Sequence, residues 1–272
     1  MPFIAALAVA SAALIVSFIA VWLVQLRSRN AGMIDPVWAA ALGTVALFAA
    51  AAGSGDLVNR LFVAACGGIW GWRLGVHLWR RNAGRDEDYR YRAMRIRWGA
   101  TAPRRMLALF VLQAAIAAAL SLAFFIPAYQ AARPTVTGAT ASLAIWLASV
   151  AGEAAADRQL RRFVAKPERS GQVCDDGWWR YSRHPNYFFE CLHWCAYAAW
   201  SAGRPWGWVT LLPPLLMGWL LLRVSGIPLL EAHLQDSRAG YRDYQRRTSA
   251  LIPWPPRRPP APSTRDPTEP RS

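Results

Sequence analysis

The 272-residue sequence has few charged residues for its length, since Asp, Glu, Lys and Arg make up only 17%, whereas 54% of the residues are hydrophobic. Soluble domains average about 25% charged residues, so this balance excludes an ordinary soluble protein. The apolar residues are also grouped, and residues 3–25 contain no formal charge. A run of about 20 such residues crosses the hydrocarbon core of a bilayer. The sequence therefore predicts a membrane protein.

Cysteine is scarce too, and the four cysteines predict no disulfide framework, because only Cys174 lies in a polar loop. A metal site is not predicted either. Cys191 and Cys195 share a helix face, but His193 points away from them and no second Cys/His set completes a tetrahedral site. The sequence thus indicates neither redox-active nor metal-binding cysteines.

The N-terminal apolar run lacks the basic residues that precede a cleavable signal, and it exceeds the roughly 7–15 residues of a signal's apolar core. We predict a retained helix, the first of seven transmembrane helices in an all-α bundle. The seven predicted spans are residues 3–25, 36–53, 57–79, 106–128, 135–156, 187–202 and 205–224. We find no internal repeat, so residues 1–252 are predicted to form one membrane domain. The proline-rich residues 253–272 are predicted to be a disordered tail.

Basic residues alternate in number between the two sides of the predicted bundle. One side carries 27 Lys and Arg residues and the other carries three. The positive-inside rule then places the N-terminus outside and the C-terminus in the cytoplasm. Because topology accounts for the net charge of +15, nucleic-acid binding is not predicted. The expected location is a bacterial inner membrane.

Ionisable residues inside predicted spans are energetically costly and mark either functional sites or buried pairs. Asp35 precedes Pro36, which suits an N-cap followed by proline at the first helical position, although a proton-transfer role is the alternative. His77 lies four residues after Arg73 on one helix face, where the two can form a structural pair with a carboxylate or take part in chemistry.

Two carboxylates, Glu153 and Asp157, also lie four residues apart on one helix face, followed by several arginines that include Arg162. Like charges at this spacing repel each other, so their coexistence requires a nearby cation or hydrogen-bond donor. A bound ligand is one source of such a donor.

The densest motif is GWWRYSRHPNYFFECLHW, residues 177–194. It offers guanidinium, phenol, amide and carboxylate groups on Arg180, Arg183, Tyr187, Asn186 and Glu190. The two guanidinium groups can fork onto phosphate oxygens, the phenol can stack, and the amide can donate and accept toward a carboxamide or base. The motif therefore favours a nucleotide site. Positive-inside anchoring followed by a structural Asn–Glu pair is the alternative.

The strings YSRHPNYFFE, Glu153-x-x-x-Asp157-Arg-Gln-Leu and YRDYQRRTSALIPW resemble the C-terminal region of the steroid 5-alpha-reductase family. IDPVW and GRDEDYRY extend the resemblance to the uncharacterised bacterial membrane branch of that family. Similar Arg-His-Pro-x-Tyr strings occur in isoprenylcysteine carboxyl methyltransferases and related phospholipid methyltransferases, which use S-adenosylmethionine.

The resemblance implies NADPH held by the cofactor half, residues of about 150–252, and a lipid-like substrate between the earlier helices. It assigns cofactor- or site-lining roles to Asp157, Asn186, Glu190 and, less directly, Arg223. The Glu and Tyr with which the characterised reductases polarise a substrate ketone have no match in this sequence. We expect Asp35 or His77 to supply the proton instead, on the basis of their position in the second and third spans.

The predicted function is NADPH-dependent reduction of an activated C=C bond, an enone, in a steroid-like or other lipid. The predicted catalytic residues are Asp35, His77 and Glu190, and the predicted cofactor-binding residues are Asp157, Arg162, Arg180, Arg183, Asn186, Tyr187 and Arg223. Two alternatives remain: methyl transfer from S-adenosylmethionine to a lipid, and a non-catalytic lipid-binding membrane protein.

Overall fold

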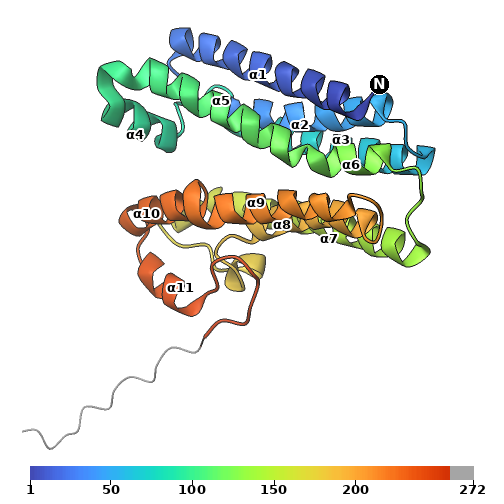
Figure 1. The fold of residues 1–272 in the computed structure, drawn as a ribbon. Helices are drawn as coiled ribbons and strands as arrows, with labels where there is room; N and C mark the ends of the chain where they lie inside the picture. The colour runs from blue at the N-terminus through green and yellow to red at the C-terminus, as the bar shows by residue number, and fades with distance from the viewer. Residues whose placement is uncertain (258–272) are drawn as a thin grey trace, which may run out of the picture. The chain divides into compact units, whose positions relative to one another are not determined.

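The computed structural model describes residues 1–257, which fold into helices joined by short turns, with no β-strand in that range (Figure 1). The predicted all-α class is confirmed. The described residues form two compact units. Unit 1 comprises Met1–Val150 and Glu190–Leu220, and unit 2 comprises Ala151–Phe189 and the chain from Leu221 onward.

Unit 1 contains most of the long helices. They are α1 (Phe3–Ser28), α2 (Ile34–Ala52), α3 (Leu57–Asn82), α4 (Tyr89–Trp98), α5 (Ala102–Leu120), α6 (Leu122–Tyr129), α9 (Leu212–Trp219), and parts of α7 (Val136–Val164) and α8 (Pro185–Ser201). The side chain of Asp56 caps α3 by accepting from the Val58 N–H at 2.8 Å. Helices α2 and α3 approach closely at Gly43 and Gly71, where a Cβ on Gly71 would lie 2.5 Å from the Gly43 Cα. Glycine therefore permits this helix contact.

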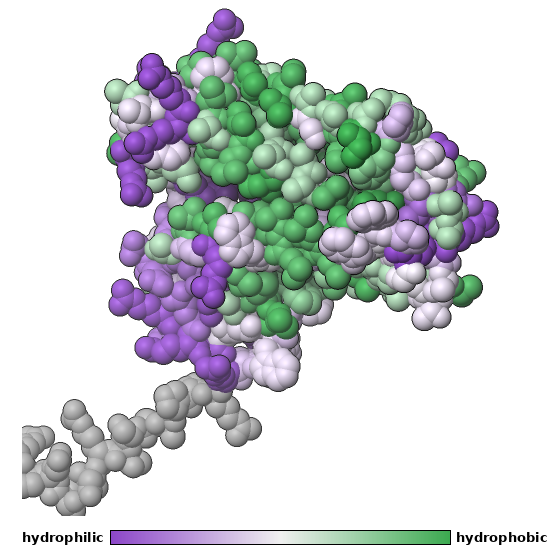
Figure 2. Space-filling model, in the orientation of Figure 1, coloured by the Kyte–Doolittle hydropathy of each residue, from purple (hydrophilic) through white to green (hydrophobic). Residues whose placement is uncertain are grey.

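Six helical segments of the described chain are long and apolar enough to cross a membrane. They are Phe3–Ser28, Ile34–Ala52, Leu57–Asn82, Tyr89–Tyr129, Val136–Val164 and Gly207–Ser237. Large apolar side chains stay exposed along them, including Ile4, Val16 and Leu215, and hydrophobic residues cover much of the helical surface in Figure 2. This surface suits lipid contact.

The observed helices differ from two of the predicted spans, in length at residues 187–202 and in the point where the helix begins at residues 205–224. The predicted span 187–202 coincides with α8, which has 17 residues and is not among the six segments. In the predicted span 205–224, Pro213 and Pro214 occupy the first turn of α9, after a 3₁₀ turn at Gly207–Leu211. Proline lacks an N–H that the first helical turn does not need, so a helix start accommodates both residues.

Unit 2 contains the end of α7, the first turn of α8, a π turn at Leu220–Val224, α10 (Ile227–Ser237) and α11 (Tyr241–Arg247). One of its hydrophobic clusters consists of Phe163, Cys174 and Trp179, with Leu160 packed against them. The Trp179 indole N–H donates to the Ala156 carbonyl at 3.0 Å and so holds the loop onto α7.

The segment after α11 folds back onto the loop that precedes α8. The Trp254 N–H donates to the Tyr181 carbonyl at 3.0 Å, and the Arg257 N–H donates to the Arg247 carbonyl at 2.8 Å. The chain is thus hydrogen-bonded into unit 2 as far as Arg257, the fifth residue of the predicted disordered tail. Residues 258–272 of that prediction lie outside the described residues.

Candidate functional site

The predicted site residues divide between the two units. The three predicted catalytic residues lie in unit 1, namely Asp35 on α2, His77 on α3 and Glu190 on α8. The seven predicted cofactor-binding residues lie in unit 2, on α7 (Asp157 and Arg162), the loop before α8 (Arg180 and Arg183), the start of α8 (Asn186 and Tyr187) and the π turn (Arg223).

Asp35 joins α2 to α4 within unit 1. Its carboxylate accepts from the Arg90 guanidinium at 2.6 Å and from the Tyr91 hydroxyl at 2.8 Å. The N-cap interpretation is wrong, because Met33 occupies the N-cap position of α2 and no side chain caps that helix. The partners come from the GRDEDYRY motif, where Asp88 caps α4 and also pairs with Arg90. Both oxygens of Asp35 are therefore engaged in a contact that stabilises this helix pair.

Asp157 and Asn186 come together in unit 2, although they are 29 residues apart in the sequence. The Asn186 amide donates to the Asp157 carboxylate over a long 3.4 Å. The side-chain oxygen of Asn186 accepts from the Tyr187 backbone N–H at 3.1 Å. The contact places two of the predicted cofactor-binding groups, the Asp157 carboxylate and the Asn186 amide, side by side at the start of α8. Both residues are only partly buried.

Arg183 occupies a different environment from the one that the sequence predicts. Its guanidinium forms a two-pronged ion pair with Glu231 of α10, through Nε at 2.6 Å and Nη2 at 3.2 Å. Its Nη1 donates to the carbonyls of Thr248 at 2.6 Å and Gln245 at 2.9 Å. Both charged side chains are 12% exposed. The guanidinium is therefore occupied by the protein itself, and its observed role is to position the C-terminal elements.

His184 completes this arrangement, which we call the Arg183–Glu231 clip and define as Arg183, His184, Glu231 and Gln245. The His184 Nε2 lies 2.9 Å from a Glu231 oxygen, and the Gln245 amide donates to the other oxygen at 2.7 Å. Sequence reasoning missed Glu231, since the only signal was a carboxylate on an otherwise apolar stretch of α10. The clip fastens the Arg-His-Pro turn to α10 and α11.

Acidification is expected to weaken the clip. Burial lowers the pKa of His184 below its ordinary value of 6.5, and the hydrogen bond to Glu231 opposes this effect only in part. Below about pH 6.5 the unfolded state then binds more protons than the folded state, so the free energy of unfolding falls as the pH drops through this range. Well above pH 6.5 His184 is neutral in both states and contributes no pH dependence.

Thermal unfolding of the purified protein in detergent, followed from about pH 8 to about pH 5, measures this effect. His184→Gln keeps a hydrogen-bonding side chain but does not titrate, so its unfolding temperature should fall less steeply over the acidic part of the range. Equal slopes in the two proteins would assign the acid sensitivity to other groups.

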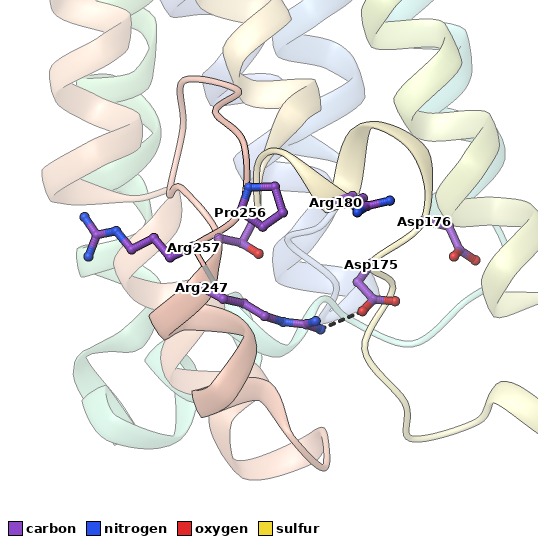
Figure 3. A pocket seen from close by; sticks show the side chains of 7 residues that line it. Asp175, Asp176, Arg180, Arg247, Pro256 and Arg257 are labelled. Atoms are coloured by element: carbon purple, nitrogen blue, oxygen red, sulfur yellow. Dashed lines mark hydrogen bonds and ion pairs between the residues drawn. The ribbon is translucent and has the colours of Figure 1, made fainter. Parts of the chain in front are cut away.

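A polar cavity of about 450 Å³ lies in unit 2 next to the clip's C-terminal elements (Figure 3). Its lining residues are Asp175, Asp176, Arg180, Arg247, Thr248, Pro256 and Arg257. All of them lie outside the six segments of membrane-spanning length. The 3₁₀ turn Gly177–Arg180 presents Arg180, and the end of α11 presents Arg247.

The two aspartates of the cavity are already paired. Arg247 contacts Asp175 at 2.6 Å, and Arg169 contacts Asp176 at 2.6 Å. The exposed Arg180 forms no side-chain hydrogen bond or ion pair with any residue of the described range 1–257. The Arg257 side chain extends away from the other labelled side chains in Figure 3. The cavity thus combines one uncommitted guanidinium with a second that has further N–H groups to offer.

This arrangement can bind an anion. Guanidinium groups present N–H donors in a planar fork that matches phosphate oxygens, and such charge-assisted hydrogen bonds are about twice as strong as neutral ones. Because each aspartate has an arginine partner, neither presents an uncompensated negative charge to an incoming phosphate. No group of three or more potential metal ligands occurs among residues 1–257.

Together these features define a helical protein with apolar segments of membrane-spanning length and an arginine-lined polar cavity outside them. Residues 21–248 match the family described as protein of unknown function (DUF1295), and the chain belongs to that family. The match includes Arg180, Arg183 and Arg247 but ends before Arg257. No curated protein and no solved structure matches the chain.

Proposed function

We propose that the protein is a membrane-embedded reductase that uses NADPH to reduce the C=C bond of an enone in a steroid-like or other lipid. The observation that carries the proposal is the uncommitted Arg180 guanidinium in the cavity of unit 2. The resemblance of residues 150–254 to the steroid 5-alpha-reductase family supports the choice of cofactor, since NADPH carries three phosphate groups for such a site.

Residues of unit 2 fit the parts of this cofactor. Arg180 and Arg247 would hold phosphate oxygens, whereas Asp157 and Asn186 offer an acceptor and a donor to its uncharged groups. Arg162, Tyr187 and Arg223 remain proposed contacts, and Glu190 a proposed site-lining residue. When bound, NADPH supplies a hydride for the β-carbon of the enone.

A proton must also reach the reduced product. We propose that His77 delivers it to the α-carbon, because an imidazole can exchange a proton near neutral pH. Asp35 is a weaker candidate, because its two carboxylate oxygens already accept hydrogen bonds from Arg90 and Tyr91. This assignment keeps the reacting residues of the protein on the apolar helices of unit 1.

The proposal includes seven membrane crossings, with the N-terminus outside and the C-terminus in the cytoplasm of a bacterial cell. Helix α8 would be the seventh span, because its 17 residues extend about 26 Å at 1.5 Å per residue, close to the hydrocarbon thickness of about 30 Å. The 27-to-3 asymmetry of basic residues supports the orientation. The cavity would then face the cytoplasm, where NADPH is available.

Binding by the full-length protein in detergent tests the proposal. NADPH should raise the unfolding temperature, and the rise should grow with the NADPH concentration, whereas S-adenosylmethionine at the same concentration should cause no rise. NADPH should also be oxidised when an enone sterol is added. A shift with S-adenosylmethionine alone would identify a methyltransferase, and no shift with either at millimolar concentration would favour a non-catalytic membrane protein.

A further inference from the structure

The short turn that presents Arg180 to the cavity of unit 2 takes its position from other elements. We call it the Arg180 turn and define it as the 3₁₀ turn Gly177–Arg180. Hydrogen bonds in a 3₁₀ turn have poor geometry, so a turn this short depends on outside contacts for its position. The Arg180 side chain lines the cavity and forms no hydrogen bond or ion pair within residues 1–257 (Figure 3). The contacts of its neighbours therefore decide where the guanidinium can lie.

One of these contacts comes from Gln159, on α7. Its side-chain oxygen accepts from the Trp178 backbone N–H at 3.0 Å. Gly177 lies directly against the same amide group, since a Cβ on Gly177 would lie 2.5 to 2.7 Å from three atoms of the Gln159 side chain. Gly177 also has a φ of +59°, a conformation that other residues rarely adopt. A glycine at this position therefore lets Gln159 approach the start of the Arg180 turn.

The two tryptophans of the Arg180 turn are anchored through their side chains. The Trp178 ring packs edge-on against Phe189 of α8, with the ring centroids 5.1 Å apart. The Trp179 indole N–H donates to the Ala156 carbonyl of α7 at 3.0 Å. Because these bulky side chains attach the turn to two helices, loss of one hydrogen bond at its start should shift the turn without unfolding unit 2.

The position of the backbone matters for binding because the Arg180 side chain is long and flexible. A ligand that holds the guanidinium removes much of its rotamer entropy, and a backbone that became ordered at the same time would weaken binding further. The hydrogen bond from α7 and the aromatic contacts order the turn before a ligand arrives. A guanidinium on a turn that is already ordered therefore binds a phosphate group more tightly.

We propose that Gln159 is a positioning residue for phosphate binding, because its hydrogen bond to the Trp178 N–H places Arg180 at the cavity. The inference deepens the proposed function and rests on it for the source of the phosphate groups, the NADPH cofactor. Gln159 is not among the predicted cofactor-binding residues, and it acts through Arg180 without touching the ligand. Binding of a simple phosphate compound needs neither the nicotinamide nor a lipid substrate, so it can be measured separately.

A double-mutant cycle tests whether Gln159 acts through Arg180. The probe is inorganic pyrophosphate, added to the full-length protein in detergent, and the rise in unfolding temperature with its concentration reports even weak binding. Gln159→Met keeps the length of the side chain but removes the acceptor, so it should weaken pyrophosphate binding about three- to tenfold. In the Arg180→Ala background the same change should weaken binding less than about twofold, because the guanidinium that it positions is absent.

Gln172→Met is the matched control, because the Gln172 amide donates to the Glu168 carbonyl at 3.0 Å in the exposed loop before the turn and does not line the cavity. It should bind pyrophosphate as tightly as the wild type. Gly177→Ala perturbs the same contact from the other side, because its Cβ would displace the Gln159 side chain. It should weaken binding at least as much as Gln159→Met, and again only where Arg180 is present.

Wild-type affinity in both Gln159→Met and Gly177→Ala, or equal losses with and without Arg180, would overturn the inference. Absence of pyrophosphate binding by the wild type would overturn it as well. If pyrophosphate gives the expected cycle but NADPH does not bind, the proposed function fails while the role of Gln159 stands. If NADPH binds but the effects of the two substitutions on pyrophosphate binding are additive, the role of Gln159 alone fails.

Discussion

Arg183→Ala is expected to lower the free energy of unfolding by about 3–5 kcal/mol, the usual effect of removing one partner of a buried ion pair. The variant leaves the Glu231 carboxylate, 12% exposed, without its two-pronged partner and removes the donors to the Thr248 and Gln245 carbonyls. Because these bonds fasten α10 and α11 to the loop before α8, unit 2 should unfold first. Limited proteolysis and thermal unfolding in detergent measure the effect.

Replacement of both charges separates the structural role of the pair from a role in ligand binding. Arg183→Met combined with Glu231→Leu removes the unpaired charge that either single change leaves, so the double variant should be more stable than the sum of the single effects predicts. Arg242→Ala, an exposed change on α11, should have little effect. Normal stability of Arg183→Ala together with weakened NADPH binding would contradict the structural role and restore the phosphate-binding one.

The contrast between Arg180 and Arg183 shows where sequence reasoning ends. Both lie three residues apart in one basic, aromatic loop, and the pattern assigns both to phosphate binding. They differ only through tertiary contacts: Glu231, 48 residues after Arg183, pairs with Arg183 and not with Arg180. Local spacing carries no information about such a partner, because it depends on how α10 packs.

The helices themselves were largely predictable, since long apolar runs have few alternatives to a helix in a membrane. The limits of prediction lie at the polar residues inside them. Asp35 has the local sequence of an N-cap, but α4 delivers Arg90 and Tyr91 to it from 55 and 56 residues away. The sequence presents His193 only beside two cysteines, as a possible metal ligand, whereas the structure places it against Trp70 of a different helix.

The contact between Asp157 and Asn186 is another feature that local sequence spacing does not predict. The family resemblance assigns both Asp157 and Asn186 to the cofactor site, but the two residues lie 29 positions apart and their spacing does not predict a contact. The structure brings them within 3.4 Å.

The Arg180→Ala variant is expected to bind NADPH about tenfold to a hundredfold more weakly than the wild type, because a hydrogen bond to a charged group contributes about 1.5–3 kcal/mol. Its stability should stay near that of the wild type, since the exposed Arg180 side chain has no partner among residues 1–257. Calorimetric titration of the full-length protein measures the affinity. Arg180→Lys should recover only part of it, because an ammonium lacks the planar fork of donors.

Two controls, a change in ionic strength and an Arg257→Ala variant, make the binding test of Arg180 specific. Raising the ionic strength should weaken NADPH binding to the wild type more than binding to Arg180→Ala, because the variant lacks one of the charges that salt screens. Arg257→Ala should change the affinity less than Arg180→Ala does, because its side chain extends away from the other cavity residues (Figure 3). Equal losses in both variants would mean that the cavity attracts anions through its general positive charge, and the phosphate would then have no defined site at Arg180.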